Sequence, residues 1–70
     1  MNVRLSRKRL VRIHLEGATE SVEGILLGRS RGHYVLLAAS LVAGEDQTYK
    51  LDGPHILVPR ERVLFVQVRQ

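Results

Sequence analysis

The sequence predicts an all-β protein, a small, five-stranded and strongly bent barrel preceded by a basic N-terminal arm or short helix. Short apolar runs separated by Gly, Pro and Asp turn residues are typical of sandwiches and barrels. Two glycines interrupt one of these runs, which favours a sharp bend. In a chain of only 70 residues, a closed or nearly closed barrel is favoured because it leaves few exposed strand edges.

The composition is that of one small folded domain, with 44% hydrophobic and 26% charged residues and no cysteine. We assign residues 1–10 to the arm and residues 11–70 to the barrel. A domain of this size without disulfides depends on tight packing or on partner subunits. No apolar run approaches the ~20 residues that span a bilayer, and no signal peptide is recognisable. We therefore expect a soluble protein with no membrane partner.

Positive charge is concentrated near the N-terminus. Residues 1–15 contain five basic residues and no acid, whereas residues 16–70 contain six basic and seven acidic residues. The basic arm comprises Arg4, Arg7, Lys8, Arg9 and Arg12. Such an arm would contact an acidic protein surface or, nonspecifically, nucleic acid. The alternative is a solvated terminus.

The first two strands follow from local patterns. Residues 11–15, "VRIHL", alternate apolar and polar side chains, which predicts a half-buried strand. Residues 16–20, "EGATE", supply a turn. Residues 21–30, "SVEGILLGRS", form the second strand, in which Gly24 and Gly28 indicate bending or close backbone approach.

The middle of the chain is less regular. Arg31-Gly32 predicts a turn before the apolar run at 33–42, "HYVLLAASLV", whose second half is compatible with strand, helix or irregular structure. A polar loop, "AGEDQ", follows. In "TYKLDGPHILVP", the break at residues 52–54 allows either a hairpin or a loop that enters one strand, "HILV". Pro59 ends that strand, a short turn follows, and "VLFVQV" at 63–68 is the last strand.

The order of these elements over roughly residues 11–68 resembles the Sm-like fold. The family's first motif is, in outline, G-x-L-x-G-x-D-x-x-x-N-x-x-L, and its second is I-R-G-x-x-V-x-x-I. "GILLGRSRGHYVLL" and "VPRERVLFV" match their framework positions through Gly24, Leu26, Gly28, Leu37, Val58, Val63 and Val66.

The positions that hold a uracil base in that family differ here. Ser30 stands in place of the Asp, Tyr34 in place of the Asn, and Pro59-Arg60 in place of the Arg-Gly pair. The resemblance therefore implies the bent-barrel architecture and weakens the expectation of RNA binding. Separately, the C-terminal "GPHILVPRERVLFVQV" resembles short structural proteins of tailed phages.

The last strand is apolar on both faces. If Leu64, Val66 and Val68 point inward, then Val63 and Phe65 face outward. Natural proteins avoid such an exposed edge unless a partner covers it. In Sm-like rings the last strand pairs with the next subunit, so the resemblance implies self-association here. The predicted interface is Val63, Phe65, Gln67 and Arg69. Packing of both faces within one small barrel, against Val3 and Leu5, is the alternative.

No constellation predicts catalysis, a metal site or a cofactor. His14, His33 and His55 are not at a metal-ligand spacing. None of the serines has the context of an activated nucleophile, and no phosphate-binding loop is present.

One loop offers a candidate nucleic-acid site. Arg29, Arg31, His33 and Tyr34 lie in or beside it and combine positive charge with an aromatic ring. However, aromatic residues are 4% of the chain, and single-strand binders normally present several stacking platforms. The alternative is a basic turn with a tyrosine that caps the barrel.

Together these patterns predict a non-enzymatic structural subunit of a multi-subunit assembly. The expected setting is a phage virion, as a head–tail connector or capsid accessory protein assembled in the host cytoplasm. Its partners would be copies of itself in a ring or other oligomer and other structural proteins, with nonspecific nucleic-acid contact. An Sm-like, cytoplasmic RNA-binding protein with an altered pocket is the main alternative, and a small regulator of one protein partner is another.

Overall fold

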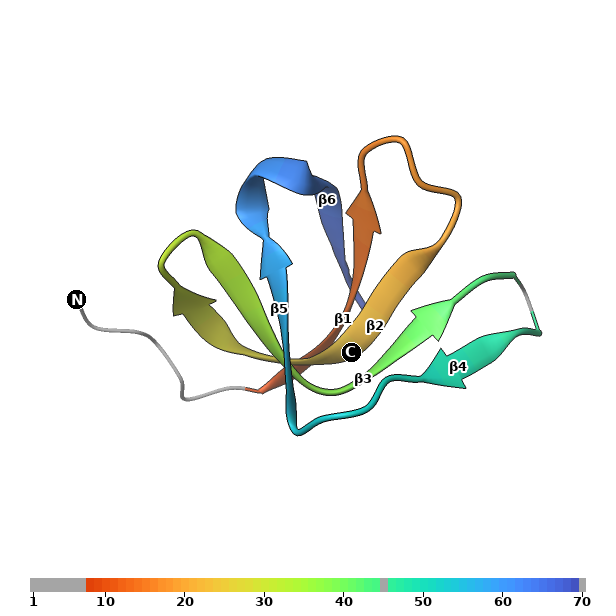
Figure 1. The fold of residues 1–70 in the computed structure, drawn as a ribbon, viewed down its shortest axis with the longest axis horizontal. Helices are drawn as coiled ribbons and strands as arrows, with labels where there is room; N and C mark the ends of the chain where they lie inside the picture. The colour runs from red at the N-terminus through yellow and green to blue at the C-terminus, as the bar shows by residue number, and fades with distance from the viewer. Residues whose placement is uncertain (1–7, 45, 70) are drawn as a thin grey trace.

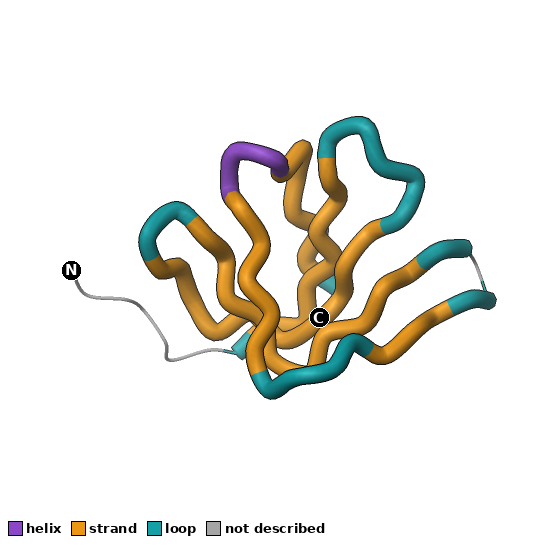
Figure 2. Tube along the Cα trace, viewed as in Figure 1, coloured by secondary structure: helices purple, strands orange, loops and turns teal. Residues whose placement is uncertain are grey.

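The computed structural model describes residues 8–44 and 46–69, which form one antiparallel sheet (Figure 1). A 3₁₀ helix, η1 (Arg60–Arg62), joins the last two strands (Figure 2). No helix among these residues is long and apolar enough to cross a membrane. The all-β prediction is confirmed. The strands are β1 (Arg9–Leu15), β2 (Ser21–Ser30), β3 (His33–Val42), β4 (Thr48–Lys50), β5 (His55–Pro59) and β6 (Val63–Val68).

The sheet is organised around β3. Its strand order is β4-β3-β2-β1-β6, and β5 also pairs with β3. The first half of β3 pairs with β5 and its last three residues pair with β4. The sequence predicted five strands, whereas the described residues form six. The 48–59 run is split at Asp52-Gly53-Pro54, and its two strands pair with β3 rather than with each other as a hairpin would.

A sharp irregularity in the backbone of β3 allows this strand to pair with both β4 and β5. Ala38 has φ +54°, and the register between β2 and β3 shifts opposite it, between Glu23 and Ile25. Gly24 lies in this shift, where an added Cβ would be 3.1 Å from both the Cα of Ala39 and the carbonyl oxygen of Leu37. Close backbone approach at this glycine, one of the two options that the sequence suggested, is what the structure shows.

The core lies inside the curve of the sheet. Ile13 and Leu36 are fully buried at its centre. The positive φ at Ala38 breaks the alternation of β3, so that Leu36 and Ala39 both face inward. The buried hydrophobic residues are Val11, Ile13, Val22, Leu36, Ala39 and Val58.

The sheet curves around this core without closing. Among the described strands, β6 pairs only with β1, and β5 pairs only with β3. The two strands are joined through η1 and make no ladder with each other (Figure 1). The predicted closed or nearly closed barrel is therefore an open, bent sheet whose β5 and β6 each keep one unpaired edge.

The last strand contains a bulge that the sequence did not reveal. His14 pairs with Phe65, but the next residue, Leu15, pairs with Val63, so Leu64 is an extra residue. The predicted alternation is consequently wrong at this end of β6: Val63 packs against the core, while Leu64 is 62% exposed. A one-residue insertion shifts every earlier side chain to the opposite face.

The rest of β6 keeps its predicted directions. Val66 and Val68 pair with Ile13 and Val11, two core residues, and so share their inner face. Val68 is nevertheless 55% exposed, since the open sheet does not cover it. Phe65 lies on the outer face and is 50% exposed.

We expect Gly24 to be essential for folding. Because a Cβ would press on backbone atoms of β3, Gly24→Ala should lower the free energy of unfolding by about 1–3 kcal/mol, the range for overpacking. Gly24→Val should prevent folding. Gly44→Ala is the matched control, since nothing lies within 4 Å of its added Cβ. Urea unfolding monitored by circular dichroism measures these changes, and a native-like Gly24→Val protein would contradict the assignment.

Candidate assembly interface

Strand β6 carries three exposed apolar side chains. We call Leu64, Phe65 and Val68 the β6 apolar edge; each is at least half exposed. None of them is among the side chains that pack against the core. An unpaired strand edge that carries exposed apolar residues is either a binding surface or an aggregation hazard.

An open groove of about 610 Å³ runs along this edge. Its apolar wall is formed by Val63 to Val66 of β6. Tyr34 of β3 and the charged side chains of Arg60 and Glu61 in η1 complete the lining. The groove thus lies where the sheet fails to close and combines an apolar wall with one positive and one negative charge.

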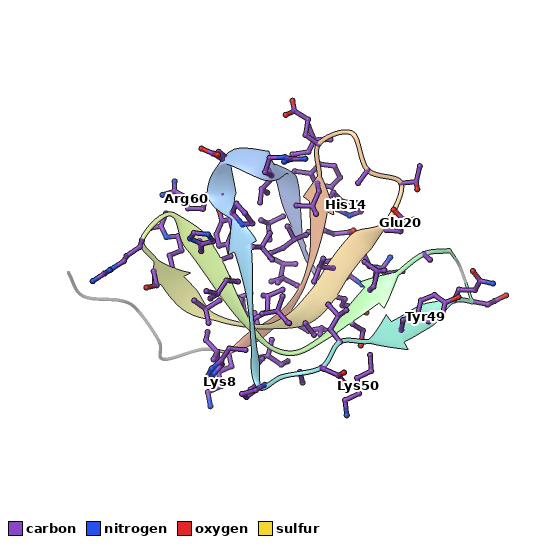
Figure 3. All side chains as sticks on the ribbon, in the orientation of Figure 1. Lys8, His14, Glu20, Tyr49, Lys50 and Arg60 are labelled. Carbon is purple, nitrogen blue, oxygen red and sulfur yellow. The ribbon has the colours of Figure 1, made fainter. Side chains whose placement is uncertain are left out.

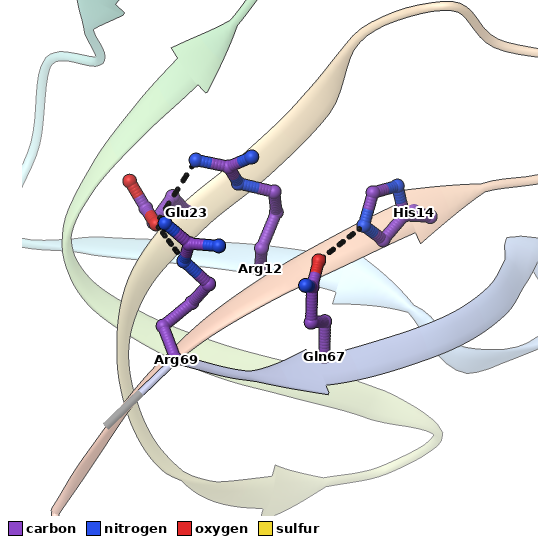
Figure 4. Close-up of polar contacts among 5 residues, drawn as sticks. All are labelled: Arg12, His14, Glu23, Gln67 and Arg69. Atoms are coloured by element: carbon purple, nitrogen blue, oxygen red, sulfur yellow. Dashed lines mark hydrogen bonds and ion pairs between the residues drawn. The ribbon is translucent and has the colours of Figure 1, made fainter.

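Phe65 is held in place despite its exposure. Its ring stacks on that of His14 with centroids 4.3 Å apart and an angle of 19° between the planes. His14 Nε2 in turn donates a hydrogen bond to Gln67 Oε1 at 3.1 Å (Figure 4). Gln67, a predicted interface residue, therefore supports the aromatic pair on the outer face of the sheet.

An ion-pair network ties the end of β6 to the two strands beside it. Glu23 Oε2 lies 3.4 Å from Arg12 Nη2 and 3.4 Å from Arg69 Nε (Figure 4). The backbone N–H of Arg69 also donates to the carbonyl oxygen of Leu10 at 2.8 Å. Arg69, the last predicted interface residue, is thus fixed to β1 and β2.

The predicted basic arm divides into three parts. Arg4 and Arg7 lie outside the described residues. Lys8 and Arg9 are exposed, and Arg9 already belongs to β1, where it pairs with Leu26. Arg12 is a strand residue in an ion pair rather than a residue of an extended arm.

The predicted nucleic-acid residues lie at the β2–β3 turn. Arg29 and Arg31 are exposed. Arg31 and Gly32 both have positive φ, 49° and 77°, which matches the tight turn of a hairpin. His33 Nδ1 donates to the carbonyl oxygen of Arg31 at 3.0 Å, whereas Tyr34 is half-buried and lines the groove.

Arg60, which is distant in the sequence, also contacts this turn. Its backbone N–H donates to the carbonyl oxygen of Gly32 at 2.8 Å, and its side chain lines the groove with Tyr34 (Figure 3 labels Arg60). Sequence reasoning missed this neighbour because 28 positions separate Gly32 and Arg60.

A second exposed apolar edge is formed by β4 and β5, the two strands that pair with β3 on the side away from β2. Leu57 of β5 is 58% exposed and Tyr49 of β4 is 53% exposed. The alternation in "HILVP" could have indicated Leu57, because the flanking Ile56 and Val58 pack in or against the core.

The described residues contain no group of three or more His, Asp or Glu side chains arranged to hold a metal ion. No protein-family model matches the chain, and a comparison with curated proteins finds no similar sequence.

We expect Glu23→Gln to loosen the end of β6 without unfolding the protein. Removing the carboxylate charge breaks both ion pairs, and partly exposed pairs contribute at most about 1 kcal/mol each. Hydrogen exchange should quicken at the amides of β6 and at the start of β1. Glu61→Gln is the control, since Glu61 is exposed and makes no ion pair with another described residue. Equal exchange rates in the two variants would show that the network does not hold β6.

Proposed function

We propose that this chain is a non-enzymatic structural subunit of a multi-subunit assembly, built through the β6 apolar edge. The observation that carries the proposal is the edge of β6 that pairs with no other described strand: Leu64, Phe65 and Val68 are exposed along β6, and Leu64 and Phe65 line the groove. Each exposed apolar Å² that a partner covers contributes roughly 25 cal/mol. A partner strand would also satisfy the free backbone groups of the edge.

A second copy of the chain is the proposed partner. The free edge of β5, with Leu57, differs from that of β6, so joining them is a head-to-tail contact that can close into a ring.

The proposed setting is a tailed-phage virion, as a head–tail connector or capsid accessory protein. The resemblance of residues 53–68 to short phage structural proteins supports this setting. Such a subunit would also contact other structural proteins of the particle. Its basic residues 4–9 would meet an acidic neighbour or, nonspecifically, packaged nucleic acid.

Acidic substitutions in the β6 apolar edge should block assembly and leave a folded monomer. Leu64→Glu and Phe65→Glu place a charge where the partner strand would bury the side chain, which costs several kcal/mol per unpaired charge. Multi-angle light scattering on the purified protein should show the wild type as an oligomer and both variants as monomers. Val63 is unsuitable for this test because it packs against the core.

Ala18→Glu is the matched control, because it adds the same charge at an exposed position in the β1–β2 loop. It should assemble like the wild type. If Leu64→Glu and Phe65→Glu also assemble normally, or if the wild type is monomeric at high concentration, the β6 apolar edge is not a self-association surface.

RNA binding is the second candidate function, and one observation favours it. The contact of Arg60 with Gly32 brings a third arginine to the turn that holds Arg29 and Arg31. With Tyr34 beside Arg60 in the groove, these side chains combine phosphate-binding charge with an aromatic ring.

We expect no tight binding of short RNA at physiological salt. Tyr34 is half-buried and packs against the core, so its ring has little surface free for stacking on a base. Fluorescence anisotropy with labelled oligouridine should give at most weak, salt-sensitive binding that Tyr34→Leu leaves unchanged. Tyr49→Leu serves as the control for the loss of an exposed ring. Sub-micromolar affinity that depends on Tyr34 and Arg60 would instead support the RNA-binding function.

A further inference from the structure

A second hollow, of about 300 Å³, lies on the outer face of the sheet. His14, Ser21 and Val42 stand side by side on β1, β2 and β3. Ser21 is the smallest of the three and is buried. Thr19 in the β1–β2 loop and Ala43 and Gly44 after β3 form the rim, so the hollow opens between two connections of the sheet.

Arg12 brings positive charge to this hollow. Its Nη2 contacts Glu23, but its Nε is buried and has no hydrogen-bond partner among the described residues. Glu23 is shared with Arg69, so within this group of three side chains one carboxylate faces two guanidinium groups, which leaves one positive charge in excess. Figure 4 shows that only one of the two terminal nitrogens of Arg12 is directed at Glu23.

The other polar groups of the hollow are hydrogen-bond donors. The hydroxyls of Thr19 and Ser21 make no hydrogen bond with another described residue. His14 contributes its ring, of which Nε2 is bound to Gln67. Among the described residues, no carboxylate lines the hollow. Glu20 lies between Thr19 and Ser21 in the sequence, but it is exposed and is not part of the lining.

We propose that this hollow binds a small oxyanion, of the carboxylate or phosphate type. A guanidinium that is not fully paired, together with two hydroxyls, is the donor set that such anions accept from most strongly. Ser21 and Thr19 both line the hollow with Arg12, so their hydroxyls are available to an anion bound there. This site does not depend on the assembly proposal, because its ligand is a free small molecule.

The test is a titration of isotope-labelled protein, followed by NMR, with inorganic phosphate and with acetate at constant ionic strength. Saturable shifts centred on the amides of Ser21, His14 and Val42 are expected for at least one anion, which identifies the class of ligand. Ser21→Ala and Arg12→Gln should each weaken binding about tenfold, the effect of losing one hydrogen bond to a charged group. Arg29→Gln, a change of the same kind at the β2–β3 turn, should leave the affinity unchanged.

His14→Phe keeps a ring against Phe65 while it removes the polar nitrogens, so it tests the site without loss of the stack. Ser21→Ala and His14→Phe carry the test if Arg12→Gln does not fold. Shifts that grow linearly without saturation for both anions would overturn the proposal. So would shifts centred on the β2–β3 turn, or an affinity that Arg29→Gln lowers as much as Ser21→Ala does.

Discussion

The close approach of β2 and β3 at Gly24 is the constraint on which the other features of the structure depend. A Cβ at this position would lie 3.1 Å from backbone atoms of β3, which is closer than most side chains approach, so glycine fits here with the least strain. At this point β3 changes direction through Ala38, which lets its two halves pair with β5 and β4. Because of the same change in direction, the side chains of Leu36 and Ala39 both face the hydrophobic core.

The bend also explains why the molecule has a candidate interface. The sheet curves far enough to bury Ile13 and Leu36, but it stops before β5 and β6 can pair. Their free edges carry Leu57 on one side and Leu64 and Phe65 on the other. In a domain this small, the buried area supplies little stability beyond the entropy cost of folding. Covering these edges with a second copy would add apolar burial where the single chain lacks it.

The two faces of the β1–β6 pair have different chemistry. The inner face is apolar, as the pairing of Ile13 with Val66 illustrates. The outer face carries the stack of His14 on Phe65 and the ion pairs of Glu23. The polar contacts fix the position of β6, whose outer edge is the proposed assembly surface. The same polar face provides the donors around the hollow in front of Ser21.

Local chemistry made much of the fold predictable. Alternation and turn residues indicated the strand at 21–30, the turn at Arg31-Gly32 and the end of β5 at Pro59, and the structure places each of them there. The second half of the 33–42 run, which the sequence left open as helical or irregular, is part of strand β3. The exposed position of Phe65 was also predictable. The tertiary structure alone decided that Leu64 is a bulge and that the sheet stays open. It alone brought Arg60 to the β2–β3 turn and joined Arg12 and Arg69 through Glu23. The physical reason is that side-chain alternation and turn preference act between neighbours in the chain, whereas register, closure and ion pairing depend on how strands distant in sequence meet.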